Sequence, residues 1–231
     1  MKIYLYEDRK DVYIRAYYPE NAKRPMPAVL ICPGGGYFIV GTTEGRPVSD
    51  KFTDAGYAAF LLNYSVGDNA VFGKGGFGEF GPARDLSAAM ALLRENADEY
   101  GIDRERIALI GFSAGGHLCA SWAFSGAYAN SELLPMGLIL SYPMGGEPDR
   151  DFDITRMPYT DDPALRHLPV FVWHAMDDNI VPFEVSERLA ARLAEEGIPY
   201  NFLPCGHGIH ARPFFHPEWF QKALDWLAAL R

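Results

Sequence analysis

The six residues G-F-S-A-G-G at 111–116 constrain this chain more than any other segment. They follow the apolar run 107–110, which predicts a buried strand, and lead into the small-residue run 115–120, which predicts a helix. Strand, G-x-S-x-G and helix together are typical of a sharp turn that exposes a nucleophilic serine, and the glycines avoid collisions there. The turn also puts the N–H of Ala114 at a helix N-terminus, facing developing negative charge. The alternative is an incidental serine in a glycine-rich loop, which the flanking strand and helix disfavour. Ser113 is therefore the candidate nucleophile.

A serine nucleophile requires a base and an orienting acid, here expected downstream in the order Ser, Asp, His. The predicted strand 169–174 runs into the loop 175–182, which carries two neighbouring aspartates. A second predicted strand, 200–204, is followed by Cys-Gly-His-Gly. A histidine between two glycines is free to turn its ring toward the serine, although a histidine of this kind alone is more often an ordinary loop residue. Its position after the acid loop makes His207 the predicted general base.

A glycine run near the N-terminus predicts an oxyanion hole. The apolar run 28–32 predicts a strand, and Pro-Gly-Gly-Gly-Tyr at 33–37 ends it. Three consecutive glycines let the backbone turn its N–H groups toward a substrate oxygen without steric cost. A flexible turn is the alternative, but the run follows an early strand upstream of the serine, where the second donor is expected. We expect Gly35 and Gly36 to donate together with Ala114.

Strands alternate with helices along the whole chain. Most of the predicted strands are continuous apolar runs, typical of a sheet covered on both faces. Eight strands are predicted, near 2–6, 11–18, 28–32, 57–63, 106–110, 137–142, 169–174 and 200–204. Apolar residues at helical spacing predict helices within 82–97, 185–193 and 220–230. We therefore expect one α/β domain over residues 1–231, with a mostly parallel, doubly wound sheet and helices on both faces.

Composition and charge exclude several classes of partner. The net charge of −9 argues against nucleic acid, which needs a basic face. No apolar stretch approaches the roughly 18 residues of a membrane span, and the first residues carry no signal-peptide core. Three cysteines suit a reducing compartment, so a cytoplasmic protein is expected. His207 and His210 are spaced like a metal pair, but no H-E-x-x-H, paired C-x-x-C or G-x-G-x-x-G motif accompanies them, so no metal or cofactor is expected.

Five segments carry a resemblance to a known family: 33–37, from Pro82 to Asp103, 111–118, 173–182 and 197–208. Through them the chain resembles the α/β-hydrolase superfamily and, more narrowly, bacterial acetyl-xylan or carbohydrate acetylesterases and feruloyl-esterase-like proteins. That resemblance implies an α/β-hydrolase fold. It also implies that the acid lies four residues after the histidine of an H-x-x-x-D-x-x-V-P pattern. Counted from His174, this residue is Asp178, and Asp177 is rejected on spacing alone.

Two loops fall outside the motifs. The glycine-rich segment 67–81 either forms a wall of the acyl or alcohol pocket or is a surface loop. The polar segment 145–164 stands where such hydrolases insert a cap, and it is too short for a domain. The chain also departs from the family at Cys205, where a glycine is frequent. We expect a minimal cap and an open site, and His117 is expected to be a packing or hydrogen-bonding residue.

The resemblance and the motifs together imply a serine carboxylic-ester hydrolase. We expect an acyl-enzyme on Ser113 and removal of short acyl groups, such as acetyl, from carbohydrates or other small esters. An amidase, formamidase or oligopeptidase-like peptidase with the same triad is the first alternative. A non-catalytic binding protein on a hydrolase fold is the second, and fold analogy alone does not choose among substrates. The sequence does not predict the oligomeric state.

Overall fold

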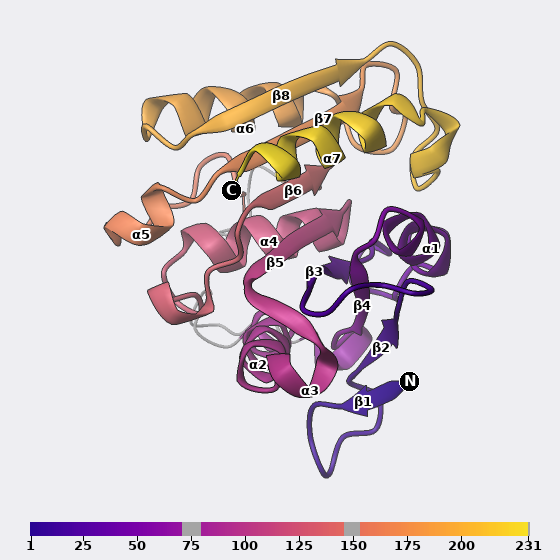
Figure 1. Cartoon of the computed structure of the whole chain (residues 1–231). Helices are drawn as coiled ribbons and strands as arrows, with labels where there is room; N and C mark the ends of the chain where they lie inside the picture. Colours follow the sequence, from indigo (N-terminus) through magenta and orange to yellow (C-terminus); the bar gives the residue numbers. More distant parts are fainter. Residues whose placement is uncertain (71–79, 146–152, 231) are drawn as a thin grey trace.

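A single eight-stranded sheet organises the computed structural model, which describes residues 1–70, 80–145 and 153–230. The strand order is β1-β2-β4-β3-β5-β6-β7-β8 (Figure 1). β2 is antiparallel to both of its neighbours, whereas every pair from β4 to β8 is parallel. The predicted mostly parallel sheet is therefore confirmed, with an antiparallel hairpin at one edge.

All eight predicted strands are present, with small shifts at their ends. Their bounds are Lys2–Tyr4 (β1), Tyr13–Tyr17 (β2), Met26–Cys32 (β3), Ala58–Asn63 (β4), Ile102–Phe112 (β5), Leu138–Ser141 (β6), Val170–Ala175 (β7) and Tyr200–Cys205 (β8). β5 begins four residues earlier than the predicted 106–110. Its polar start, Asp103–Glu105, is exposed or half-buried and so lies outside the apolar run by which the strand was predicted. The central strands β6 and β7 are buried along their whole length, as strands covered on both faces must be.

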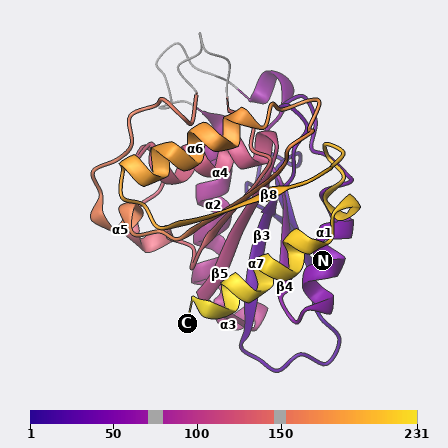
Figure 2. The same cartoon turned by 90° about the horizontal axis from the view of Figure 1, so that it is seen from above.

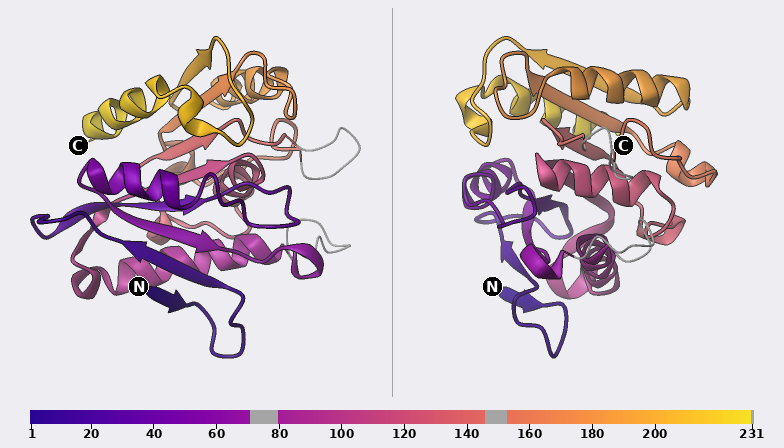
Figure 3. Two further views of the ribbon diagram at one scale, coloured as in Figure 1. Left: turned by 90° about the vertical axis from the view of Figure 1, so that its right-hand side faces the viewer. Right: turned by 180° about the vertical axis from the view of Figure 1, so that it is seen from behind.

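Helices cover both faces of the sheet, which makes it doubly wound (Figures 2 and 3). Their bounds are Arg46–Asp54 (α1), Gly81–Glu95 (α2), Ala97–Tyr100 (α3), Ala114–Phe124 (α4), Pro163–Arg166 (α5), Glu184–Glu195 (α6) and Glu218–Ala229 (α7). α1 and α7 pack on one face, through Phe52 and Trp219 among others. α2, α4 and α6 pack on the other, where Leu86, Trp122 and Leu189 are fully buried. Short 3₁₀ turns occupy Gly67–Asn69, Ser131–Leu133 and Pro213–Phe215.

The two loops singled out in the sequence are only partly described. Residues 71–79 of the glycine-rich segment and 146–152 of the cap segment lie outside the described residues. In the remainder of the cap segment and its continuation, residues 153–169, the one helix is the four-residue α5. No helix in the described part of the chain is both long and apolar enough to cross a membrane.

Candidate active site

Ser113 occupies a tight turn between β5 and α4. Its backbone has a positive φ of 51° with ψ −117°, a strained conformation for a residue with a side chain. The neighbouring glycines permit this turn: a Cβ on Gly111 would lie 2.2 Å from the Gly115 carbonyl oxygen, and one on Gly115 would lie 2.0 Å from the Cys32 carbonyl oxygen. The collisions expected from the G-x-S-x-G motif are therefore present, and the geometry is that of a nucleophile elbow.

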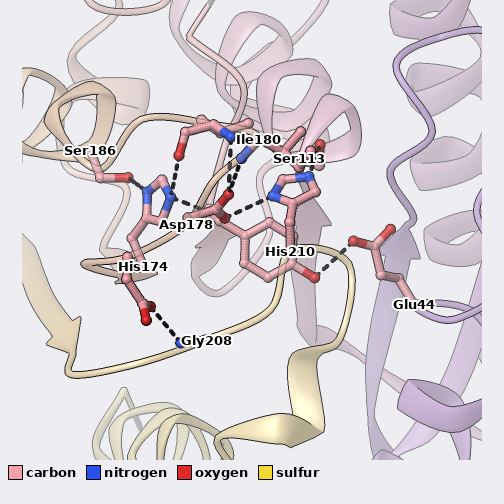
Figure 4. A network of polar contacts seen from close by, with 11 residues as sticks. Glu44, Ser113, His174, Asp178, Ile180, Ser186, Gly208 and His210 are labelled. Carbon is pink, nitrogen blue, oxygen red and sulfur yellow. Dashed lines mark hydrogen bonds and ion pairs between the residues drawn. The ribbon is translucent and has the colours of Figure 1, made fainter.

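His210 is the histidine that meets Ser113. Its Nε2 lies 2.9 Å from the Ser113 Oγ, and its Nδ1 lies 2.8 Å from the Asp178 Oδ2 (Figure 4). A carboxylate only accepts, so Nδ1 carries the hydrogen and Nε2 is free to accept from the serine hydroxyl. The three side chains thus form one hydrogen-bonded row in the geometry required of a nucleophile, a base and an orienting acid.

The prediction that His207 serves Ser113 is wrong. Its side chain is 81% exposed and its Nδ1 pairs with the Asp177 Oδ2 at 2.9 Å, away from the serine. The reason is reach. β8 lies three strands from β5, roughly 14 Å at about 4.8 Å per strand. Two residues of extended chain beyond β8 span about 7 Å, whereas the five residues to His210 span about 17 Å. Counting strands would have favoured the later histidine.

Asp178 is held by several donors at once. Its Oδ1 accepts from the N–H groups of Ile180 and Val181 at 2.9 and 3.0 Å, and its side chain is 2% exposed. Burial by itself would raise the pKa of this carboxyl. Hydrogen bonds from His174, His210 and the two backbone N–H groups outweigh burial and hold the pKa well below its usual range. The structure thus brings Asp178, and not Asp177, to the histidine that contacts Ser113.

His174 explains the H-x-x-x-D spacing physically. The ring is completely buried, with Nε2 3.1 Å from the Val181 carbonyl oxygen and 3.4 Å from the Asp178 Oδ2. A carbonyl oxygen only accepts, so Nε2 carries the hydrogen and the Ser186 hydroxyl donates to Nδ1 at 2.8 Å. His174 therefore ties the end of β7 to Asp178 and Val181 of the acid loop and to Ser186 on α6, which fixes the position of Asp178.

The glycine loop lies directly against the nucleophile. A Cβ on Gly34 would come within 2.8 Å of the Ser113 Cβ, and the backbone is left-handed at Gly35 and Gly36, with φ 125° and 62°. The Gly34 N–H is already donated to Glu44 at 2.6 Å. Within the described part of the chain, no hydrogen bond engages the N–H of Gly35, Gly36 or Ala114. These three N–H groups remain the predicted oxyanion donors.

A buried pair beside the site was missed by the sequence analysis. The Tyr142 hydroxyl donates to the Glu44 Oε1 at 2.7 Å, and both residues are almost inaccessible to solvent. The Tyr142 ring lies against the His210 ring, with centroids 4.9 Å apart. Nothing in the local sequence marks Glu44, since a glutamate just before a helix ordinarily faces water.

His117 has the structural role expected of it. Its Nδ1 lies 2.8 Å from the Tyr37 hydroxyl in the core beneath the glycine loop. Across residues 1–70, 80–145 and 153–230, no group of three or more His, Cys, Asp or Glu side chains is arranged to hold a metal ion. The two histidines spaced like a metal pair, His207 and His210, instead pair with different aspartates.

Fold and site together define an α/β hydrolase with a Ser–His–Asp row. A sequence model of the BD-FAE family matches residues 14–136, just over half of the chain, so the chain belongs to the BD-FAE family. The crystal structure of MGS-M1, an alpha/beta hydrolase enzyme from a Medee basin deep-sea metagenome library, superposes with a TM-score of 0.82 at 26% identity. That match covers 100% of this chain and 96% of the other.

Two curated relatives are named for activities on xylan. The endo-1,4-beta-xylanase B of Butyrivibrio fibrisolvens is 29% identical over 88% of this chain and 35% of its own length. The acetylxylan esterase of Xylanibacter ruminicola is 27% identical over 93% of this chain and 47% of its own length. The chain therefore spans less than half of the length of either relative.

Proposed function

We propose that this chain is a serine hydrolase of carboxylic esters. The observation that carries the proposal is the hydrogen-bonded row from Ser113 through His210 to Asp178. Membership of the BD-FAE family and a relative named acetylxylan esterase support it. The coarser class, a hydrolase using an activated serine, depends on the row alone, whereas the ester preference depends on the relatives.

Acylation begins when the His210 Nε2 takes the hydroxyl proton of Ser113 and the serine oxygen adds to the ester carbonyl carbon. The carbonyl oxygen becomes an oxyanion in a tetrahedral intermediate. When the intermediate collapses, the bond to the alcohol oxygen breaks and the His210 Nε2–H protonates that oxygen. Water then repeats the two steps on the acyl-enzyme, releasing the carboxylic acid and restoring the serine.

Asp178 acts by orienting and stabilising the base. It accepts from the Nδ1–H of His210, which keeps Nε2 available, and its negative charge stabilises the imidazolium that forms in each step. Its depressed pKa means that it stays ionised while His210 gains and loses a proton. The backbone N–H donors of this chemistry are Ala114 together with Gly35 and Gly36.

For the substrate, we propose a short acyl group, such as acetyl, on a carbohydrate or other small ester. The name of the Xylanibacter relative supports an acetyl group on xylan. The shortness of the segment 145–164 supports an open site that admits a bulky alcohol.

The test is Ser113→Ala. Turnover of p-nitrophenyl acetate should fall on the order of 10⁶-fold, as when the nucleophile of a serine hydrolase is removed. A fluorophosphonate probe should label the wild-type protein at Ser113 and leave the variant unlabelled. Retention of more than a tenth of the activity, with an unchanged thermal unfolding midpoint, would show that another residue is the nucleophile.

A further inference from the structure

The carboxyl of Glu44 is buried beneath the glycine loop and is not used in the chemistry above. The residue is 1% exposed, and each of its oxygens accepts one hydrogen bond. Oε2 accepts from the Gly34 N–H at 2.6 Å. Oε1 accepts from the Tyr142 hydroxyl at 2.7 Å, the dashed line to Glu44 in Figure 4. A buried carboxyl is costly unless it is hydrogen-bonded in this way. Its two partners belong to separate parts of the site. Gly34 lies in the glycine loop 33–37, called the oxyanion loop below, and Tyr142 directly follows β6.

The first partner fixes the oxyanion loop. Glu44 holds the N–H of Gly34, and the Gly41 N–H holds the Gly34 carbonyl oxygen at 2.8 Å. The Gly34 carbonyl and the Gly35 N–H belong to one planar peptide group. Both peptide groups that flank Gly34 are therefore held, and with them the direction of the Gly35 N–H. A donor that is fixed before the substrate arrives stabilises an oxyanion without reorganisation.

The second partner fixes the surroundings of the base. The Tyr142 ring is tilted against the His210 ring at a centroid distance of 4.9 Å, and its own backbone is left-handed, with φ 37°. Its N–H donates to the Trp173 carbonyl oxygen at 2.8 Å, and its hydroxyl is held by Glu44. Glu44 thus also holds the Tyr142 ring, against which the His210 imidazole packs.

We propose that Glu44 is a positioning residue that sets the oxyanion loop and the general base relative to one another. This inference rests on the proposed function, since it names a residue that supports that chemistry without touching the substrate. Glu44 acts through the Gly34 peptide on one side and through the Tyr142 ring on the other.

The hydrogen bonds allow the role of Glu44 to be separated from its charge. The Gly34 N–H can only donate, whereas a tyrosine hydroxyl both donates and accepts. A glutamine at 44 would accept from Gly34 with its oxygen and donate to the Tyr142 oxygen with its amide. Glu44→Gln therefore keeps both links, and Glu44→Ala removes both.

The chain offers a matched control in Asp85. This carboxyl is also 1% exposed and also accepts from a backbone N–H, that of Ser65 at 2.7 Å, and from a tyrosine hydroxyl, that of Tyr6 at 2.9 Å. It accepts from the Ser65 hydroxyl as well. It lies on α2, outside the described chemistry. Asp85→Ala thus removes a buried carboxyl with the same kinds of partner and reports the purely structural cost of such a loss.

The experiment measures kcat per fluorophosphonate-titrated serine, KM for p-nitrophenyl acetate, and affinity for a trifluoromethyl ketone that forms a tetrahedral adduct with the serine. Glu44→Ala should lower kcat on the order of 10²-fold, as when one oxyanion donor is lost, and should weaken the ketone in parallel while KM changes little. Glu44→Gln should restore most of both, and Asp85→Ala should leave kcat per titrated serine unchanged.

Equal values of kcat and ketone affinity in the wild type and Glu44→Ala would overturn the inference, as would an equal loss in Asp85→Ala. If Glu44→Ala does not fold, Tyr142→Phe decides, because it removes only the bond to Oε1: a lower kcat per titrated serine supports the link to His210, and a wild-type value refutes it. A wild-type protein that neither turns over the ester nor takes the probe would instead refute the proposed function itself.

Discussion

The His210 Nε2 lies 2.9 Å from the Ser113 Oγ although 97 residues separate the two along the chain. The contact is possible because β5 and β8 run parallel in one sheet, so the loops after them leave the same edge. Ser113 is fixed by a tight turn at that edge, whereas the histidine must cross two intervening strands. The fifth residue after β8, and not the second, is therefore the one that reaches the serine.

The two histidines of this loop should respond differently to substitution. We expect His210→Ala to lower kcat on the order of 10⁶-fold, because a serine without its base loses about as much as the absent serine itself. His207→Ala should leave kcat/KM near the wild-type value, since His207 is paired with Asp177 and the histidine at Ser113 is His210. Folding should also be unaffected, because the exposed pair of His207 and Asp177 contributes little to stability. Steady-state kinetics on p-nitrophenyl acetate measure both, and a larger loss in His207→Ala would refute the assignment.

The neighbouring aspartates allow a second paired test. Asp178→Asn should lower turnover roughly 10⁴-fold, because the amide offers the wrong hydrogen-bonding pattern to the His210 Nδ1–H. Asp177→Asn should cost far less, since among the described residues that carboxylate is hydrogen-bonded to His207 and the Gly208 N–H and not to His210. Comparable losses in the two variants would mean that the row through Asp178 does not carry the reaction.

The ionisation of Asp178 leads to a prediction about how stability depends on pH. The pKa of Asp178 is depressed in the folded protein relative to about 3.9 in an unfolded chain. A depressed carboxyl pKa adds stability that is fully present above the unfolded pKa and is lost as the pH falls toward the folded value. The free energy of unfolding of the wild type minus that of Asp178→Asn should therefore be constant above about pH 5 and shrink below about pH 4.

Urea unfolding of both proteins at a series of pH values measures this difference. Asp177→Asn is the control, because its carboxyl is 49% exposed and its stabilisation by His207 is screened by solvent. A difference between wild type and Asp178→Asn that stays constant down to pH 3 would contradict the assigned ionisation of Asp178.

Much of the fold follows from local sequence patterns. The apolar runs of β3, β6 and β7 are continuous because both faces of those strands are covered, and this is the pattern that predicted them. The elbow was predictable for a similar reason, since Gly111 and Gly115 are required by close backbone approaches within a few residues of Ser113 or against β3. Local steric requirements of this kind can be predicted from the glycines that satisfy them.

Relationships across the sheet were harder to predict. The choice between His207 and His210 depends on how many strands the loop crosses, and strand order is not a property of either residue's neighbours. Glu44 was missed because its burial is created by partners at Gly34 and at Tyr142, 98 residues away. α1 was not predicted, because its apolar face depends on only a few residues such as Val48 and Phe52.

The acyl group accepted by the site provides the last prediction. We expect kcat/KM for p-nitrophenyl esters to be greatest for acetyl or propionyl and to fall beyond about four carbons. Without an apolar groove, each added methylene brings little binding energy to offset the cost of accommodating a longer acyl chain. An enzyme with such a groove would gain about 0.8 kcal/mol for each methylene it buries. Among the described residues of 153–169, α5 is a single turn of helix with one buried apolar side chain, Leu165, and offers no long apolar surface to a fatty acyl chain. A maximum at eight or more carbons would contradict the short-acyl preference while leaving the serine chemistry intact, and acetylated xylo-oligosaccharides measured alongside would show whether a sugar alcohol is preferred.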